Sequence, residues 1–233
     1  MRKNSIKNRI YTYASNKSYF SVKDLKKYFK KINVIYSDEN LKKSLYRMRK
    51  DEIIYSAGRG WYSTLKQEFE LDKKPIMEIT ELISRDFPIL EFSCWGTEQL
   101  KAFFHHLPTQ FVIFISSEKD YLESLRDSLE NHNYNVFINP LKSEAEKFVH
   151  FKDQTAILRP SITKREPKDG HFAKIEKIVV DLHMEIKKVN LMDGEEYKRV
   201  VSNILDNFRI NVADMLEYAE RRGIRDTIAS FVH

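Results

Sequence analysis

The feature that most constrains the fold of this chain is a continuous apolar run, FVIFIS, at residues 111–116. A strand that is apolar on both faces is typical of a parallel sheet covered by helices on either side. An amphipathic segment with inward leucines follows at 117–133, and a second apolar run, YNVFIN, occupies 134–139. Strand, helix and strand in this order predict a βαβ unit, and therefore a parallel pair of strands with a right-handed crossover.

Further segments extend this unit in both directions. Residues 88–95 and 155–160 are predicted to be strands of the same sheet, and from residue 172 onward the apolar spacing favours helices. We therefore expect an α/β (α+β) fold class, with a C-terminal domain at 71–233 that comprises an α/β core at 85–160 and a helical part at 172–233.

The first 70 residues predict three helices followed by a two-stranded ribbon. Ser21 and Ser37 are expected to be the N-caps of the second and third helices, because each is followed by an amphipathic segment. Two aromatic-rich pieces then flank Ala57-Gly58-Arg59-Gly60, which is typical of a hairpin. This order of elements is that of a winged helix-turn-helix, in which the third helix enters the major groove of DNA. We expect such a domain at 1–70.

Charge is distributed unevenly along the chain. Residues 1–74 hold 19 lysines and arginines against 8 acidic residues, a net charge of +11, whereas the remainder has 21 against 26, a net charge of −5. A basic surface of this kind is the electrostatic footprint of nucleic-acid binding. The predicted partner is double-stranded DNA, and the candidate contacts lie on the third helix and the wing: Lys42, Lys43, Tyr46, Arg47, Arg49, Lys50 and Arg59.

Two alternatives remain for this domain. A winged helix also serves as a protein-interaction module, and a basic surface also serves only for solubility. Aromatic residues in such a domain pack into the core or a hinge more often than they contact bases, which applies to Tyr46 and Trp61. Trp61 and Tyr62 are expected to pack the ribbon onto the helices, which leaves Arg59 as the DNA contact of the wing.

Several chemistries are disfavoured by the sequence. Neither of the common glycine-rich phosphate-binding patterns is present. The single cysteine, Cys94, excludes an internal disulfide and is expected to be a small buried hydrophobe. His105 and His106 are adjacent, a spacing that does not place two metal ligands on one helix face. No cofactor or metal is expected. The lack of a long apolar run or a secretory signal favours a cytoplasmic protein with no membrane partner.

One acidic constellation favours an enzyme. Asp181, Glu185 and Lys187 resemble in composition the carboxylates and lysine of a magnesium-dependent nuclease. Asp181 and Glu185 are four residues apart and would share a helix face. Such nuclease motifs usually place the second acid and the lysine on a strand, however, whereas all three residues here fall on one predicted helix. A metal-dependent nuclease is therefore the alternative rather than the leading hypothesis.

Several short motifs resemble those of AbiEi-type antitoxins, which belong to type IV toxin–antitoxin and abortive-infection systems. The segments LRPSITK, KIEKIVVDL and RINVADMLEYAERRG are similar to the C-terminal domain of that family, and Arg59-Gly60-Trp61-Tyr62 is similar to its wing. The C-terminal residues that match the family motif are Glu176, Lys177, Asp181, Tyr218, Arg221 and Arg222.

The resemblance implies a non-enzymatic repressor and antitoxin active in phage defence. Its winged helix would bind inverted repeats in its own promoter. Its C-terminal domain would counter a nucleotidyltransferase-like toxin, with or without a stable toxin–antitoxin complex. A winged-helix transcriptional regulator without antitoxin activity is a second alternative to this function.

Overall fold

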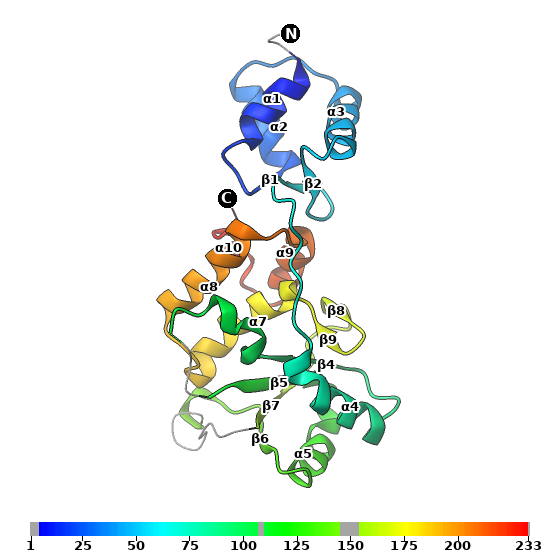
Figure 1. Ribbon diagram of the computed structural model, residues 1–233, viewed down its shortest axis with the longest axis vertical. Helices are drawn as coiled ribbons and strands as arrows, with labels where there is room; N and C mark the ends of the chain where they lie inside the picture. The colour runs from blue at the N-terminus through cyan, green and yellow to red at the C-terminus, as the bar shows by residue number, and fades with distance from the viewer. Residues whose placement is uncertain (1–4, 107–109, 145–153, 233) are drawn as a thin grey trace.

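The computed structural model describes residues 5–106, 110–144 and 154–232, and shows a small N-terminal part above a larger C-terminal part (Figure 1). The small part consists of α1 (Ile6–Ala14), β1 (Tyr19–Ser21), α2 (Val22–Lys31), α3 (Asp38–Lys50), β2 (Tyr55–Ser56) and β3 (Trp61–Ser63). Its three helices begin at serine caps. Ser21 accepts the Asp24 N–H and Ser37 accepts the Asn40 N–H, which confirms both predicted caps.

The hairpin forms part of a three-stranded antiparallel sheet with the order β1-β3-β2. We expected only the two strands of the ribbon, because β1 spans three residues and gives no readable alternation. Tyr19 in β1 pairs with Ser63 in β3, and this pairing brings the start of α2 beside the hairpin. A separate core fills the space between the helices and this sheet, centred on Leu25, Phe29 and Leu45.

The larger part is built on a six-stranded mixed sheet with the order β6-β7-β5-β4-β9-β8. Its strands are β4 (Phe92–Gly96), β5 (Val112–Ser117), β6 (Asn135–Ile138), β7 (Thr155–Pro160), β8 (Lys168–Asp169) and β9 (Phe172–Ala173). The predicted parallel pair needs correction: β5 and β6 run in the same direction, but β7 lies between them and pairs in parallel with both. Sequence order along the chain gives no signal for such an insertion.

Helices cover both faces of the sheet, as the apolar run in β5 predicted. One face packs against α4 (Met77–Asp86) and α5 (Leu122–Glu130), and the other packs against α7 (Ile175–Val189), α8 (Gly194–Asn207) and α9 (Val212–Arg221). Short 3-10 turns and a last helix complete the chain: η1 (Lys74–Ile76), η2 (Thr97–Phe103), η3 (Lys119–Tyr121) and α10 (Arg225–Ala229). The fold class is mixed α/β.

The predicted element boundaries needed smaller corrections in two places. The segment expected to be helical from residue 172 begins as strand β9, and the helix starts only at Ile175. The segment predicted as a helix after Trp95 forms the 3-10 turn η2. Gly223 follows the end of α9 with a φ of +72°, which supports its predicted role at the helix C-terminus. No helix in the described parts of the chain is long and apolar enough to cross a membrane.

The N-terminal part has its own core, but it also packs against the C-terminal part across the boundary expected near residue 70. Tyr19 and Ala57 of the N-terminal part are buried in the large apolar cluster of the C-terminal part. The Tyr19 hydroxyl donates to the Phe208 carbonyl and accepts the Ile210 N–H at 3.0 Å. The backbone of Arg209 is held on both sides: its carbonyl accepts the Phe69 N–H, and its N–H donates to the Gln67 carbonyl. These contacts fix the N-terminal part against α9.

Candidate nucleic-acid interface

The third helix, α3, presents a basic face to solvent. Leu41, Leu45 and Met48 point into the core. On the opposite side of the helix, four residues starting at Lys43 have the spacing i, i+3, i+4 and i+7, which places them on one face. These residues are exposed and lie where the sequence predicted them: Lys43, Tyr46, Arg47 and Lys50.

Most of the cations on this face are free to bind an anion. Lys43 pairs with Glu39 on the same helix at 2.7 Å. Arg47, Lys50 and the neighbouring Lys42 form no ion pair with the residues described. Tyr46 is 65% exposed, so it packs in no core and is available for contact with a partner. The structure therefore does not support the alternative that placed Tyr46 in the core.

Arg49 lies on the flank of α3 rather than on this face. It lines the cleft between the N-terminal and C-terminal parts, beside Glu52 and Tyr55. Burial raises the pKa of Tyr62 in β3, and the nearby charge of Arg49 opposes that increase. Arg49 is thus directed toward the hairpin and the cleft, away from Lys43 and Lys50.

A second basic surface lies beside the start of α3, and the sequence analysis did not select it. A hollow of about 670 Å³ opens between α2 and the beginning of α3 and is lined by Lys23, Lys26, Lys27 and Lys30. Lys26 and Lys27 are paired with Asp38 and Asp24, whereas the other two lysines make no ion pair with a described residue. The spacing of these four lysines is the signal that would have found them, because it places them on one side of α2.

The hairpin tip is docked on the C-terminal part. Ala57 O accepts the Ala213 N–H at 3.2 Å. A Cβ atom placed on Gly58 would lie 2.0 Å from Asn211 Oδ1, so the tip approaches the start of α9 as closely as glycine allows. The φ angles of Gly58 and Gly60 are +96° and +77°, conformations that favour glycine. Arg59, between them, is exposed and forms no ion pair with a described residue.

The aromatic residues of the hairpin divide between the two parts of the protein. Tyr62 stacks on Phe20 at a centroid distance of 5.7 Å and so packs on the N-terminal core, as predicted. Trp61 instead packs against the C-terminal core, so the expectation that it packs on the N-terminal helices is wrong. This arrangement makes the hairpin a fixed bridge between the parts.

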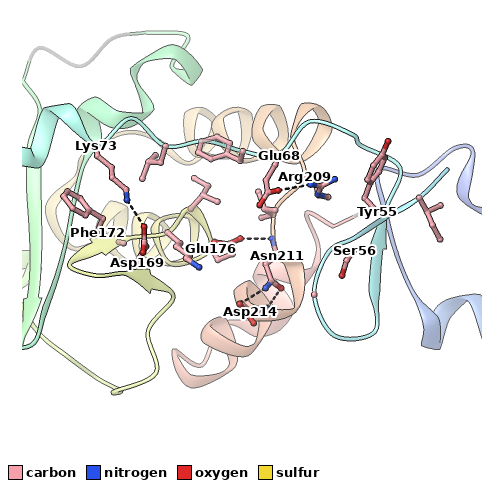
Figure 2. A pocket seen from close by; sticks show the side chains of 18 of the residues that line it. Tyr55, Ser56, Glu68, Lys73, Asp169, Phe172, Glu176, Arg209, Asn211 and Asp214 are labelled. Atoms are coloured by element: carbon pink, nitrogen blue, oxygen red, sulfur yellow. Dashed lines mark hydrogen bonds and ion pairs between the residues drawn. The ribbon is translucent and has the colours of Figure 1, made fainter. Parts of the chain in front are cut away.

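A cleft of about 740 Å³ lies between the N-terminal and C-terminal parts, beside the docked hairpin tip (Figure 2). Arg209 forms one wall, where its guanidinium lies 4.9 Å from the Tyr55 ring centroid and pairs with Glu68 at 2.8 Å. Lys73 pairs with Asp169 at 2.7 Å on another side. Most charges that line the cleft are therefore matched by a neighbour.

Glu176, a residue of the resemblance motif, also lines this cleft and is 6% exposed. Its carboxylate accepts the Asn211 N–H at 2.7 Å (Figure 2). Burial raises the pKa of Glu176, and the backbone hydrogen bond from Asn211 opposes this increase. Glu176 thereby holds the residue that caps α9 and contacts the hairpin tip.

Four motif residues that are far apart in sequence converge behind the sheet. Lys177 is fully buried, pairs with Asp181 on α7 and lies 3.1 Å from the hydroxyl of Tyr218 on α9. The Tyr218 hydroxyl donates to Asp181 at 2.9 Å, and Arg222 lies 3.7 Å from the same carboxylate. Burial alone would lower the pKa of Lys177, but Asp181, Tyr218 and Glu166 raise it above its ordinary value. The side chain therefore stays charged.

The sixth motif residue, Arg221, is directed away from this network. Its guanidinium donates to the Arg165 carbonyl and pairs with Glu217 on the same helix. Adjacent positions on a helix point in different directions, so the pair Arg221-Arg222 cannot serve one site.

The carboxylates of the nuclease alternative do not meet the lysine assigned to them. Asp181 and Glu185 share one face of α7, as predicted, but both are buried and paired with cations. Glu185 accepts two hydrogen bonds from the guanidinium of Arg159, one of them at 3.0 Å. Lys187 is exposed and belongs to another face of the helix. In the described parts of the chain no group of three potential metal ligands comes together.

With this geometry in place, the sequence comparison identifies a family. Residues 40–233 match DUF6577, a family of unknown function. The chain belongs to DUF6577. No curated protein matches the sequence.

The DUF6577 match begins within α3 and includes the hairpin, the cleft and the buried network. It leaves out residues 1–39, and with them the lysines of α2. Cys94, within the matched region, is fully buried as expected, and burial raises the pKa of its thiol to about 12.

Proposed function

We propose that this DUF6577 protein binds double-stranded DNA through α3 and acts as a winged-helix repressor. The observation that carries this proposal is the exposed basic face of α3, on which Lys43, Arg47 and Lys50 lie around an exposed tyrosine. Phosphate contacts require several cations, and base contacts require long side chains on a helix that a groove can admit.

The arrangement of the N-terminal part supports the proposal. Three helices with a sheet of order β1-β3-β2 place the hairpin directly after α3, in the order of winged-helix domains. The hairpin differs from a free wing because its tip is docked on α9. We therefore assign the DNA contact chiefly to α3, with Arg59 as a peripheral contact at the hairpin tip.

The antitoxin role is a proposal that comes from the resemblance to AbiEi-type antitoxins. The convergence of Lys177, Asp181, Tyr218 and Arg222 supports it only in that four of the six matching residues form one unit. In this proposal the protein acts in the cytoplasm, represses its own operon at inverted repeats and counters a nucleotidyltransferase-like toxin.

DNA binding is tested with the full chain and duplex DNA from the region upstream of its gene. We expect a mobility shift that the variant Lys43→Ala/Arg47→Ala/Lys50→Ala loses, because three exposed cations are removed without a change in the core. Lys119→Ala serves as the control, since this exposed lysine lies on the far C-terminal part. Absence of a shift with the wild-type protein, or an undiminished shift with the triple variant, contradicts the proposal.

The antitoxin role is tested separately by co-expression with the toxin candidate encoded nearby. Relief of growth arrest by the wild-type chain, retained in the triple α3 variant, would assign neutralisation to the C-terminal part. Continued arrest with normal expression of both proteins would remove the antitoxin role and leave a DNA-binding protein.

A further inference from the structure

Arg222 at the end of α9 is a buried arginine with few partners. Its side chain is 9% exposed, and its Nε atom is buried without a hydrogen-bond partner. The nearest carboxylate oxygen, Oδ1 of Asp181, lies 3.7 Å away, which is beyond a hydrogen bond. A guanidinium has five N–H donors, and buried donors are nearly always paired. Among the described residues, no side chain or carbonyl accepts from this guanidinium.

Lys188 lies near Arg222, because the carboxylates that they contact, Glu185 and Asp181, are one turn apart on the same face of α7. Burial lowers the pKa of Lys188 on α7, and the charges of Arg159 and Arg222 lower it further, whereas Glu185 opposes them. Lys188 Nζ lies 3.8 Å from Glu185, whose carboxylate is already held by Arg159. Lys188 therefore has only a long contact to a shared carboxylate.

The charges in this region do not balance. The four cations are Lys177, Arg159, Lys188 and Arg222, and the three carboxylates are Glu166, Asp181 and Glu185. Lys177 and Arg159 take the close contacts to these carboxylates. The excess positive charge thus falls on the other two cations, Arg222 and Lys188.

The location of this cluster is one at which α/β proteins bind ligands. Arg159 is the next-to-last residue of strand β7. Asn139, whose side-chain oxygen accepts a hydrogen bond from Arg159 at 3.1 Å, directly follows the parallel strand β6. Ligands of open α/β sheets bind beyond the carboxyl ends of the strands. Helix α7 crosses this side of the sheet (Figure 1), and the ion pair between Glu185 and Arg159 brings the last turns of α7 to the same edge.

We propose that Arg222 and Lys188 form a binding site for a phosphate group. A phosphate monoester carries between one and two negative charges and three acceptor oxygens, so it can satisfy the free guanidinium donors and the ammonium together. The inference concerns the C-terminal part alone and does not depend on DNA binding by α3.

The test is calorimetric titration of the full chain with inorganic phosphate at fixed ionic strength, and with adenosine 5′-monophosphate in a second series. We expect Arg222→Met and Lys188→Met each to weaken binding by about tenfold or more, the effect of losing a charge-assisted hydrogen bond. Arg221→Met and Lys187→Met are matched controls, because each removes a cation next in sequence that faces elsewhere. Tighter binding of the nucleotide assigns the site to a phosphate ester, and equal affinity assigns it to free phosphate.

Two results would overturn the proposal. The first is the absence of binding by the wild-type chain up to about 10 mM of either probe, well above a millimolar dissociation constant. The second is equal weakening by the matched controls, which would show diffuse attraction to a basic surface. If Arg222→Met does not fold, Lys188→Met decides the question alone, because its side chain is partly exposed and its replacement leaves the core intact.

Discussion

Replacing Lys177 with methionine is expected to destabilise the protein strongly. Methionine matches the length of the lysine stem but leaves Asp181 and Glu166 without the cation that both contact. These carboxylates have side chains that are 8% and 6% exposed, so water cannot substitute for the lost charge. Breaking a buried ion pair by removing one partner costs about 3–5 kcal/mol.

This loss is measurable by thermal unfolding of the purified chain. For a protein of this size each 1 kcal/mol changes the melting temperature by about 2–4 °C, so Lys177→Met is expected to lower it by about 6–20 °C. Lys187→Met, on the exposed side of the same helix, is expected to change stability by less than about 0.5 kcal/mol.

A double variant separates the charge effect from the packing effect. Lys177→Met/Asp181→Leu removes both members of the pair, and we expect it to be more stable than Lys177→Met alone by about 1–3 kcal/mol. A loss of less than about 1 kcal/mol in Lys177→Met, or no recovery in the double variant, would refute the claim that an uncompensated buried carboxylate governs stability here.

Further predictions concern the contact between the two parts. Glu176→Gln should make the free energy of unfolding less dependent on pH. The raised pKa of Glu176 means that the folded state holds the proton more tightly, so the stability of the wild-type protein falls as the pH rises above the ordinary carboxyl value. Urea unfolding at pH 4.5 and 7 will show whether the variant lacks this fall. Gly58→Ala should lower the free energy of unfolding by about 2–4 kcal/mol, because its Cβ would collide with Asn211. Gly60→Ala should lower it by about 1–2 kcal/mol, the cost of its left-handed backbone alone. Similar losses for both variants in thermal unfolding would contradict the docked hairpin. Tyr19→Phe should lose about 1–3 kcal/mol in denaturant unfolding, since the hydroxyl serves a backbone donor and a backbone acceptor, and an unchanged midpoint would show that this bridge contributes nothing.

The elements that the sequence predicted well are those with strong local signals. The run at 111–116 is one buried strand with helices on both sides, and Ser21 and Ser37 cap their helices, because a strand face or a cap depends on neighbours within a few residues. Strands β1, β8 and β9 are two or three residues long. β1 and β9 form through pairing with the distant strands β3 and β4, and β8 forms through its hairpin with β9. The insertion of β7 between β5 and β6 is likewise set by long-range packing.

The same distinction applies to the candidate site. The exposure of Lys43, Arg47 and Lys50 followed from the helical period of α3, because the buried stripe determines which positions face solvent. That Arg49 lines a cleft depended on the packing of the C-terminal part beside the hairpin, which no local pattern encodes. The network around Lys177 includes Tyr218, which is 41 positions away, so the sequence named Lys177 and Tyr218 only by resemblance.

The salt dependence of DNA binding tests the central claim most directly. Fluorescence anisotropy of a labelled duplex from the upstream region, titrated at several salt concentrations, gives the slope of log K against log salt. Each phosphate contact contributes about −0.9 to this slope, so Arg47→Ala and Lys50→Ala are each expected to reduce its magnitude by about one, and Lys119→Ala to leave it unchanged. A slope that is the same in all four proteins would contradict DNA binding through α3.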